Sequence, residues 1–116
     1  MSEQNCLFCK IAAGEIPAQL VYEDELAVAF RDINPQAPAH LLVIPREHLA
    51  SLSEAREDQG PLLGHLLLTA ARVAHAGGIA DSGFRTVVNN GAGAGQSVFH
   101  VHVHVLGGRA LQWPPG

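Results

Sequence analysis

The sequence predicts one α+β domain built on a largely antiparallel sheet of about five strands. Its length of 116 residues is that of a single domain. Short apolar segments of strand length outnumber helical segments, and short turns separate most of them. Only residues 57–76 are long and periodic enough to be a helix that bridges two parallel strands. The other strands are therefore expected to pair antiparallel.

The first half of the chain is expected to hold one short helix and three strands. Residues 6–13 are apolar and end at Gly14, which predicts one or two helical turns. Two strands are expected at residues 19–22 and 26–31, around an acidic turn. After a loop with two prolines, residues 40–45 (HLLVIP) form a continuous apolar run, which is typical of a central strand.

The second half is expected to contain the long helix and two more strands. Residues 57–76 place leucines, alanines and a valine at helical spacing, with Pro61 in the first turn and two glycines as a stop signal. Strands are predicted at residues 84–89 and 98–106, with a glycine-rich loop between them. The chain then ends in a tail, residues 110–116.

The charge balance argues against a nucleic-acid-binding protein. Seven Lys and Arg residues against eleven Asp and Glu give a formal net charge of −4, which offers little to neutralise phosphates. No stretch approaches the ~20 apolar residues that cross a bilayer, and the polar residues 1–5 do not resemble a signal peptide. The cytoplasm is therefore the expected location.

Three histidines alternate with valines in the last predicted strand (FHVHVHV, residues 99–105). Because side chains alternate across a strand, His100, His102 and His104 are expected on one face and the valines on the other. Exposed strand faces carry Thr, Lys, Glu or Arg far more often than His. The pattern therefore favours a chemical role for these histidines over an ordinary exposed face. Two interpretations stay open: zinc binding with a third ligand from elsewhere, and metal-free acid, base and nucleophile chemistry near neutral pH.

The loop before this strand favours the second interpretation. Residues 89–97 (NNGAGAGQS) contain three glycines, whose backbone N–H groups can closely approach an anion. Gln96 and Ser97 are expected to add side-chain donors. The loop lacks the lysine of a nucleotide-binding P-loop, so it is not one. Aligned histidines next to an anion-binding loop indicate a catalytic site for an anionic substrate.

The run HVHVHVLGGR (residues 100–109) resembles the H-x-H-x-H signature of the histidine triad (HIT) superfamily. Residues 30–48, residues 87–109 and the WPPG end of the chain resemble its nucleotide-binding branch, Hint. The resemblance covers the chain from about residue 6 to residue 116. It implies a single domain over residues 1–116, with a five-stranded antiparallel sheet, one long helix and one short helix. It also implies a homodimer in which the sheet continues across the two subunits.

The resemblance further implies an activity. Members of this branch hydrolyse purine nucleoside 5′-phosphoramidates, in which a P–N bond joins the nucleotide to an amine. They release AMP and the amine through a covalent nucleotidyl-histidine intermediate, and this chemistry requires no cofactor. Purine nucleotides and a second copy of the chain are thus the expected partners, with neither nucleic acid nor membrane.

Roles for individual residues follow from the same match. His102 corresponds to the nucleophile, His104 to the group that contacts phosphate and assists the leaving group, and His100 to a residue that orients the others. His40 corresponds to a fourth, supporting histidine, and Asp32 to the acceptor of both ribose hydroxyls. The remaining implied contacts are the phosphate loop (Asn89, Gly95, Gln96 and Ser97), a purine slot (Phe8, Ile11, Phe30 and Ile33) and a tail aromatic that reaches the partner's active site (Trp113).

Cys6 and Cys9 form a C-x-x-C pair. Some bacterial histidine triad proteins carry this pair and bind a structural zinc with two further histidines, which here correspond to His48 and His100. Two Cys and two His suit a closed tetrahedral site. The alternatives are two reduced cysteines packed in the core and, less in keeping with the context, a redox pair.

Three other functions remain open. A dinucleoside polyphosphate hydrolase would cleave P–O bonds with the same histidines, although the WPPG tail argues against it. A nucleotide-binding regulatory module would use the site for binding alone. A metalloenzyme would hold its metal on the histidine strand, and its activity would depend on that metal.

Overall fold

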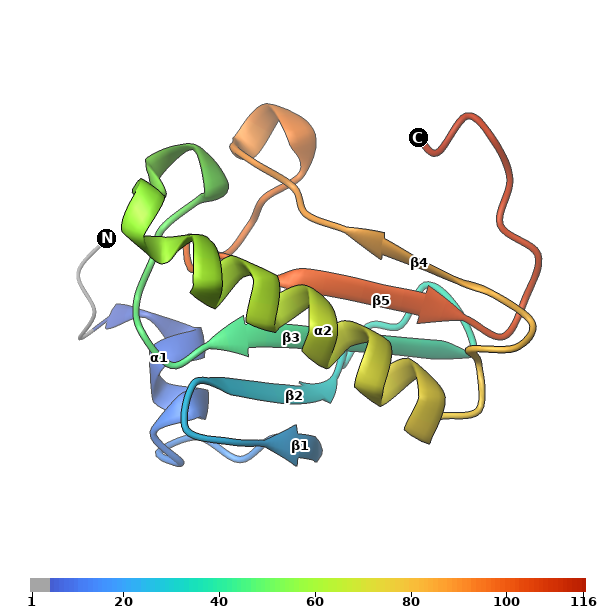
Figure 1. Ribbon diagram of the computed structural model, residues 1–116, viewed down its shortest axis with the longest axis horizontal. Coiled ribbons are helices and arrows are strands. Elements are labelled where there is room, and N and C mark those ends of the chain that lie inside the picture. The colour runs from blue at the N-terminus through green and yellow to red at the C-terminus, as the bar shows by residue number, and fades with distance from the viewer. Residues whose placement is uncertain (1–4) are drawn as a thin grey trace.

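A five-stranded antiparallel sheet forms the centre of the computed structural model, which describes residues 5–116 (Figure 1). The strands lie in the order β1-β2-β3-β5-β4 and pair antiparallel throughout. Their bounds are β1 Leu20–Glu23, β2 Ala27–Arg31, β3 Ala39–Pro45, β4 Phe84–Val87 and β5 Val103–Gly107. The predicted fold class is therefore confirmed, with β3 at the centre of the sheet as its apolar sequence indicates.

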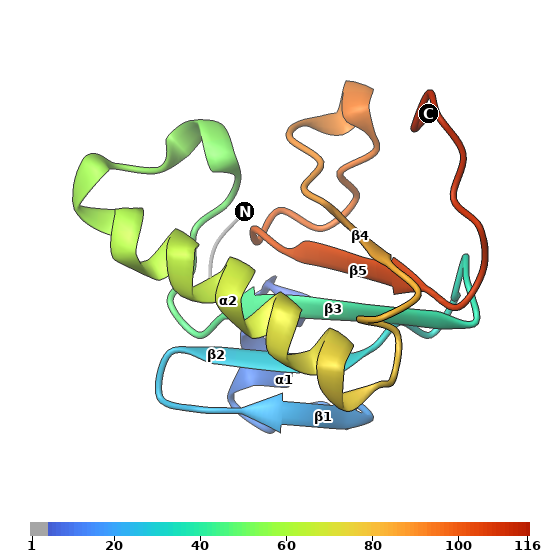
Figure 2. The ribbon, with the colours of Figure 1, turned by 45° about the vertical axis from the view of Figure 1, so that its right-hand side comes forward.

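The two helices cover opposite faces of the sheet (Figures 1 and 2). The short helix α1 spans Leu7–Ala12, and the long helix α2 spans Gly60–Ala76. The helix predicted from Glu57 begins three residues later, because residues 57–59 form a separate 3-10 turn, η3. Pro61 then lies in the first turn of α2, where its missing N–H would have no partner. Two more 3-10 turns are η2, Leu52–Glu54, and η4, Ala92–Ala94.

The alternation of β2 and β3 places one core on each face of the sheet. Ala27, Ala29 and Val43 face α2 with the valines of the last strand, whereas Val28 and Phe30 face α1. Small alanines on the α2 side leave room for the long helix to approach. Because β3 is buried on both faces, its sequence is continuously apolar and shows no alternation of apolar and polar residues.

The last strand is shorter than its sequence predicts. The prediction began it at Val98, but β5 begins at Val103, where it pairs with Val43 at the far end of β3. Before that point the chain is bonded to the segment after β3: the Val101 N–H donates to the Leu49 carbonyl at 2.6 Å. Hydrogen bonding to a loop in place of a neighbouring strand ends the ladder early. The strand predicted to reach Asn89 likewise ends at Val87.

The carboxylate of Asp24 stabilises the turn between β1 and β2 by accepting hydrogen bonds. This carboxylate accepts hydrogen bonds from the backbone N–H groups of Leu26 and Ala27, each at 2.8 Å. It also accepts from the Tyr22 hydroxyl at 2.8 Å and from Nε2 of His65, on α2, at 2.7 Å. Burial opposes ionisation of Asp24, but these donors outweigh it and hold the pKa of the carboxyl well below its usual range.

We expect Asp24→Asn to lower the free energy of unfolding by about 1–3 kcal/mol, because it removes a charged acceptor shared by four donors. The loss should be largest above pH 4 and should shrink in acid, where the wild-type carboxyl is protonated in the unfolded chain. Urea unfolding of both proteins measures the difference. Asp58→Asn is the matched control, because Asp58 is exposed and pairs with Arg56 at the surface. Equal unfolding midpoints for the Asp24 variant and the wild type would contradict this role.

No helix among residues 5–116 is both long enough and apolar enough to span a membrane. The polar segment at residues 1–4, which was compared with a signal peptide above, lies outside the described residues.

Candidate functional site

The histidine sequence lies on the α1 face of the sheet, as the alternation predicts. Val101, Val103 and Val105 pack in the core under α2, and His100 and His102 are buried on the opposite side. His104 lies in β5 opposite Leu42, and His40 lies in β3 opposite Leu106, so both point to the same face. The structure thus brings His40 into contact with His104.

The hydrogen bond of His102 fixes which of its nitrogens is nucleophilic. Nδ1 lies 2.8 Å from the backbone carbonyl oxygen of His100. A carbonyl oxygen can only accept, so Nδ1 carries the proton. Burial lowers the pKa of His102, so the ring is neutral near pH 7 and Nε2 keeps its lone pair. The edge-on ring of Phe8, with its centroid 5.0 Å away, limits movement of the imidazole.

His40 and His104 form a relay whose proton positions can be assigned in the same way. The backbone N–H of Gln36 donates to Nδ1 of His40 at 3.0 Å, so the neutral ring of His40 carries its proton on Nε2. That Nε2 lies 2.9 Å from Nδ1 of His104, which must then accept. The proton of a neutral His104 is consequently on Nε2. The site therefore combines a lone pair on His102 with an N–H on His104, whose ring centroids are 5.1 Å apart.

Burial, together with the charge that His102 and His40 would carry, lowers the pKa of His104 to about 4, against an opposing effect of the Asp32 carboxylate. His104 thus stays neutral well below the usual histidine range of about 6.5.

This shift predicts that protonation of His104 lowers kcat/KM for a cleaved nucleotide substrate only near pH 4, well below the range of an ordinary histidine. A pH–rate profile in buffers of constant ionic strength measures it. The stability of the fold should decline over the same acid range, because His104 is protonated below about pH 6.5 in the unfolded chain but only near pH 4 in the folded one. An acid limb centred near pH 6.5 that is assigned to His104 would contradict the low pKa of this residue.

Asp32 lies at the edge of this site, on the loop after β2. Its Oδ1 accepts from the backbone N–H of Asn34 at 2.8 Å, and its Oδ2 is 3.4 Å from Nε2 of His40. The carboxylate also opens into a cavity of about 540 Å³, where Ile33 is fully exposed. Pro17, Ala18, Gln19 and Arg31 complete this cavity. Sequence reasoning missed these four residues. Arg31 directly precedes Asp32, whereas the other three lie just before β1 and are brought there by the fold, in which the Arg31 N–H donates to the Gln19 carbonyl at 3.0 Å.

The other three residues proposed for the purine slot have a different environment. Phe8, Ile11 and Phe30 are buried in the core between α1 and the sheet. Phe8 touches the edge of the site through His102. Of the four candidates, only Ile33 lines the cavity beside Asp32.

The glycine-rich loop has a rigid base. Gly91 and Gly95 adopt positive φ angles of 88° and 95°, which other residues rarely adopt. The Gln96 side chain, expected as a free donor, is occupied: Oε1 accepts from the Gly91 N–H at 2.8 Å, and Nε2 donates to the carbonyls of Ala50 and Val98. This residue shapes the loop, which corrects the expectation of a free amide donor. Ser97 is exposed.

Asn89 and the tail border a second cavity, of about 260 Å³, beside His40 and His104. Leu111 and Pro115 contribute to its wall, so the tail of this chain reaches its own histidine site. Trp113 is 81% exposed. Sequence reasoning also missed Arg85 and Arg109, which line this cavity from β4 and from the segment after β5.

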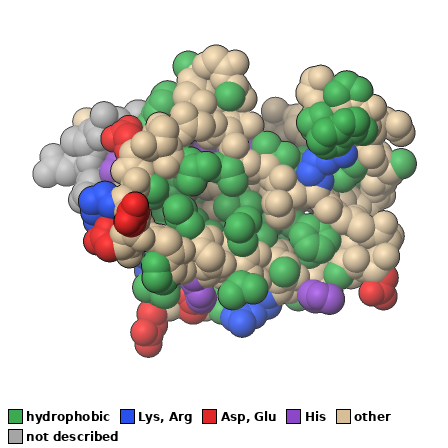
Figure 3. Space-filling view, turned by 45° about the horizontal axis from the view of Figure 1, so that its top comes forward, with side chains coloured by type: hydrophobic (Ala, Val, Ile, Leu, Met, Phe, Trp, Pro, Cys, Tyr) green, Lys and Arg blue, Asp and Glu red, His purple; other side chains and the backbone are tan. Residues whose placement is uncertain are grey.

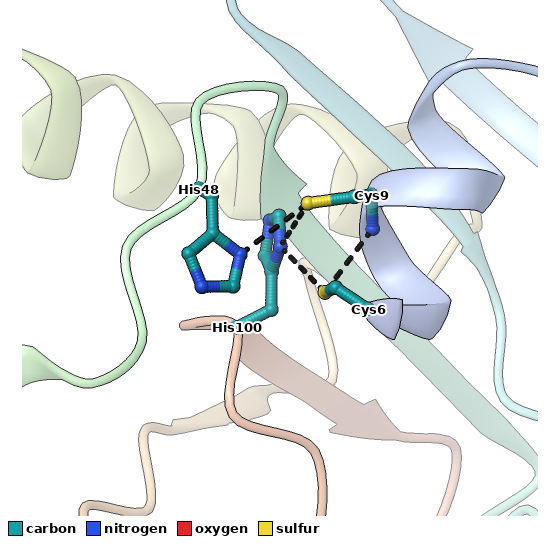
Figure 4. A group of neighbouring side chains, drawn as sticks. All are labelled: Cys6, Cys9, His48 and His100. Atoms are coloured by element: carbon teal, nitrogen blue, oxygen red, sulfur yellow. Dashed lines mark hydrogen bonds between the residues drawn. The ribbon is translucent and has the colours of Figure 1, made fainter. Parts of the chain in front are cut away.

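Cys6, Cys9, His48 and His100 converge on a second cluster, next to the triad (Figure 4). Nδ1 of His100 lies 3.3 Å from Sγ of Cys6 and 3.4 Å from Sγ of Cys9, and Nδ1 of His48 lies 3.3 Å from Sγ of Cys9. All four potential ligand atoms lie within 4.8 Å of one another. A tetrahedral zinc with bonds of about 2.3 Å to sulfur and 2.0–2.1 Å to nitrogen separates its S and N ligands by about 3.6 Å. The residues therefore fit a zinc ion.

The proton positions of His100 agree with this fit. Its Nε2 lies 2.8 Å from the Pro45 carbonyl and donates to it, which leaves the Nδ1 lone pair directed at the two sulfurs. Burial lowers the pKa of His100 to about 4, so the ring is neutral, as a metal ligand must be. The hydrogen bond between His100 and His102 runs through the His100 backbone carbonyl, while the His100 ring faces the two sulfurs.

Asp32, His40 and His104 form another group with ligand atoms within 4.8 Å. Here the protonated Nε2 of His40 is hydrogen-bonded to Nδ1 of His104, which uses both atoms. A metal bound at this group would have to replace that hydrogen bond. The cysteine cluster, whose ligand atoms converge, is therefore the better candidate metal site.

Comparisons with known proteins agree with this architecture. The family model of the HIT domain matches residues 13–111. An uncharacterised HIT-like protein of Synechococcus elongatus is 54% identical over 116 residues, which is the whole of both chains. The crystal structure of a HIT family hydrolase from Legionella pneumophila superimposes with a TM-score of 0.95 and 53% identity, over 97% of this chain and 100% of that one.

A more distant structure extends the likeness to a nucleotide-binding protein. The histidine triad nucleotide-binding protein of Candida albicans superimposes with a TM-score of 0.80 and 33% identity, over 95% of this chain and 83% of that one. The match of the family model over most of the sequence, with relatives that share about half of its residues along their full length, shows that the chain belongs to the HIT domain family.

Proposed function

We propose that this protein hydrolyses purine nucleoside 5′-phosphoramidates, releasing a nucleoside monophosphate and an amine. One observation carries the proposal: the His100 carbonyl holds the proton of His102 on Nδ1 and leaves the Nε2 lone pair for attack on phosphorus. A neutral imidazole of this kind is a nucleophile that forms a covalent phosphoryl intermediate. The names of the Legionella and Candida relatives, a hydrolase and a nucleotide-binding protein, are in keeping with it.

The reaction proceeds by two displacements at phosphorus. First, the lone pair on Nε2 of His102 forms a P–N bond, while the bond to the substrate nitrogen breaks. That nitrogen, protonated from solvent beforehand, keeps the bonding pair and leaves as a neutral amine. A water molecule then attacks phosphorus and gives up one proton to solvent, and the P–Nε2 pair returns to the imidazole. His102 keeps its Nδ1 proton throughout, so the His100 carbonyl stabilises the positive charge of the intermediate.

The other residues bind and position the substrate in this proposal. His104 Nε2–H donates to a phosphate oxygen, and His40 holds His104 in the required tautomer. Asp32 accepts the ribose hydroxyls at the mouth of the 540 Å³ cavity, with Ile33 against the base. Asn89, Gly95 and Ser97 of the glycine-rich loop contact the phosphate. The preference for P–N over P–O bonds rests on the resemblance of the loop and the WPPG tail to the Hint branch.

We also propose a homodimer joined along β4 and α2. β4 is an edge strand with β5 as its single neighbour, so one side of its backbone can pair with another chain. On the α2 side, hydrophobic side chains gather on one face (Figure 3) and line a cavity of about 130 Å³. Leu67 and Leu68 are 52% and 70% exposed on α2. A second copy would cover them, and sedimentation velocity should give twice the chain mass.

The test of the activity is the release of AMP from adenosine 5′-phosphoramidate and from diadenosine tetraphosphate, each with excess EDTA. We expect the phosphoramidate to react at least about a hundredfold faster in kcat/KM. The opposite order would favour the polyphosphate hydrolase, and tight AMP binding without turnover of either substrate would favour the regulatory module. Activity lost in EDTA and restored by a metal would favour the metalloenzyme.

A further inference from the structure

The cavity of about 260 Å³ beside His104 carries an unbalanced positive charge. Arg85 and Arg109 both line it, and none of its lining residues is an aspartate or a glutamate. The chain as a whole has a net charge of −4 with only seven Lys and Arg residues. This cavity is therefore locally positive, with two arginines and no carboxylate, although the chain as a whole is negatively charged.

The sheet places Arg85 on the face of the histidines. In the pairing of β4 with β5, Arg85 lies opposite Leu106 and Val87 lies opposite His104. In the pairing of β3 with β5, Leu106 lies opposite His40. Side chains at paired positions share a face. The guanidinium is thus two strands away from His40, across the floor of the cavity that both residues line.

Both arginines are oriented by neutral groups alone. Nη2 of Arg85 donates to the Gln112 carbonyl at 2.8 Å, which fastens the tail above the cavity. Arg109 donates to the carbonyls of Gln36 and Ala110, each at 3.0 Å. Neither arginine forms an ion pair within residues 5–116. A guanidinium has five N–H donors, so each retains donors for a ligand.

The position of the cavity indicates which part of a substrate it can hold. It shares no lining residue with the 540 Å³ cavity beside Asp32. One lining residue of each cavity contacts the other: Oδ2 of Asp32 lies 3.4 Å from Nε2 of His40. With the nucleoside in the cavity beside Asp32 and phosphorus at His102, the leaving group falls on the side of His104 and the tail.

We propose that Arg85 and Arg109 select leaving amines that carry a carboxylate, so that the preferred substrates are nucleotides joined through P–N to the α-amino group of an amino acid. This inference rests on the proposed function. Guanidinium groups bind carboxylates through paired, charge-assisted hydrogen bonds. The carboxylate takes no part in bond making: the P–N bond breaks as described above, and the amino acid leaves with its carboxylate unchanged.

A matched pair of substrates tests the selection. One is AMP joined to the nitrogen of alanine with a free carboxylate, and the other is the corresponding alanine N-methylamide, similar in size but neutral. We expect kcat/KM to be about tenfold or more higher for the carboxylate, as a charged hydrogen bond provides. The advantage should decrease as salt is raised. An equal or reversed preference would overturn the inference, and absence of AMP from both substrates would overturn the proposed function instead.

Variants separate charge recognition from support of the tail. Arg85→Gln and Arg109→Gln should each lower the ratio of the two kcat/KM values several-fold, and Arg85→Lys should restore part of it. If Arg85→Gln lowered both rates in parallel, the residue would only hold the tail, and its role in selection would be wrong. Arg72→Gln, on α2, is the control that should leave the ratio unchanged. Faster cleavage of diadenosine tetraphosphate than of the carboxylate substrate would indicate that the arginines bind a polyphosphate. That result would overturn the inference that they recognise a carboxylate.

Discussion

The His102→Asn variant is expected to lose at least about a thousandfold in kcat for AMP release, because the substitution removes the group that attacks phosphorus in the first displacement and leaves it in the second. The asparagine Nδ2–H can still donate to the His100 carbonyl, so the local hydrogen bond and the fold are retained. A continuous assay of AMP release from adenosine 5′-phosphoramidate, with excess EDTA, measures the loss.

The matched control for this variant is His75→Asn, because His75 is an exposed histidine near the end of α2. It should keep the wild-type rate. Near-UV circular dichroism and the unfolding midpoint show whether the His102 variant has kept its structure. A folded His102→Asn protein with a rate within tenfold of the wild type would contradict the assignment of the nucleophile.

The second large effect concerns the cysteine cluster. We expect the purified protein to contain one zinc per chain and His48→Ala to lose it, because the variant lacks one of four ligands. A metal bound at 100 to 1,000 times its Kd stabilises a fold by about 3–4 kcal/mol. For a domain of this size that corresponds to about 10 °C or more in Tm. Elemental analysis and thermal unfolding measure the two effects.

Two comparisons separate the zinc hypothesis from the alternative of reduced cysteines in the core. A strong chelator should lower the Tm of the wild type by a similar amount and leave His48→Ala unchanged. His75→Ala should behave as the wild type. Wild-type protein without zinc, whose Tm is the same with and without added zinc, would favour packed thiols, since Cys6 is fully buried in the α1 core.

The sequence predicted the local elements well because periodicity and turn residues determine them locally. The continuous apolar run of β3 and the alternation of the triad were each sufficient to place a central strand and a special face. The end of a strand depends on its neighbours, which no local pattern shows. Val98 to His102 have the sequence of a strand, but the Val101 N–H donates to Leu49 in the loop after β3.

Within the site, the sequence indicated the residue types but not their partners. The spacing of the histidines could not show that the His100 ring faces two sulfurs while its carbonyl orients His102. In the same way, Gln96 has the composition of a phosphate donor, and only the folded loop shows its amide bonded to backbone. Arg85 and Arg109 are 24 positions apart in the sequence, and the pairing of β4 with β5 brings them to one cavity.

The stereochemical course at phosphorus tests the central claim most directly. Hydrolysis of a single diastereomer of adenosine 5′-phosphorothioamidate in isotopically labelled water yields a chiral product whose configuration can be determined. Each in-line displacement inverts phosphorus, so attack by His102 followed by attack by water gives net retention. Retention is the result that this account predicts. Inversion would mean that water attacks phosphorus directly, and His102 would not be the nucleophile.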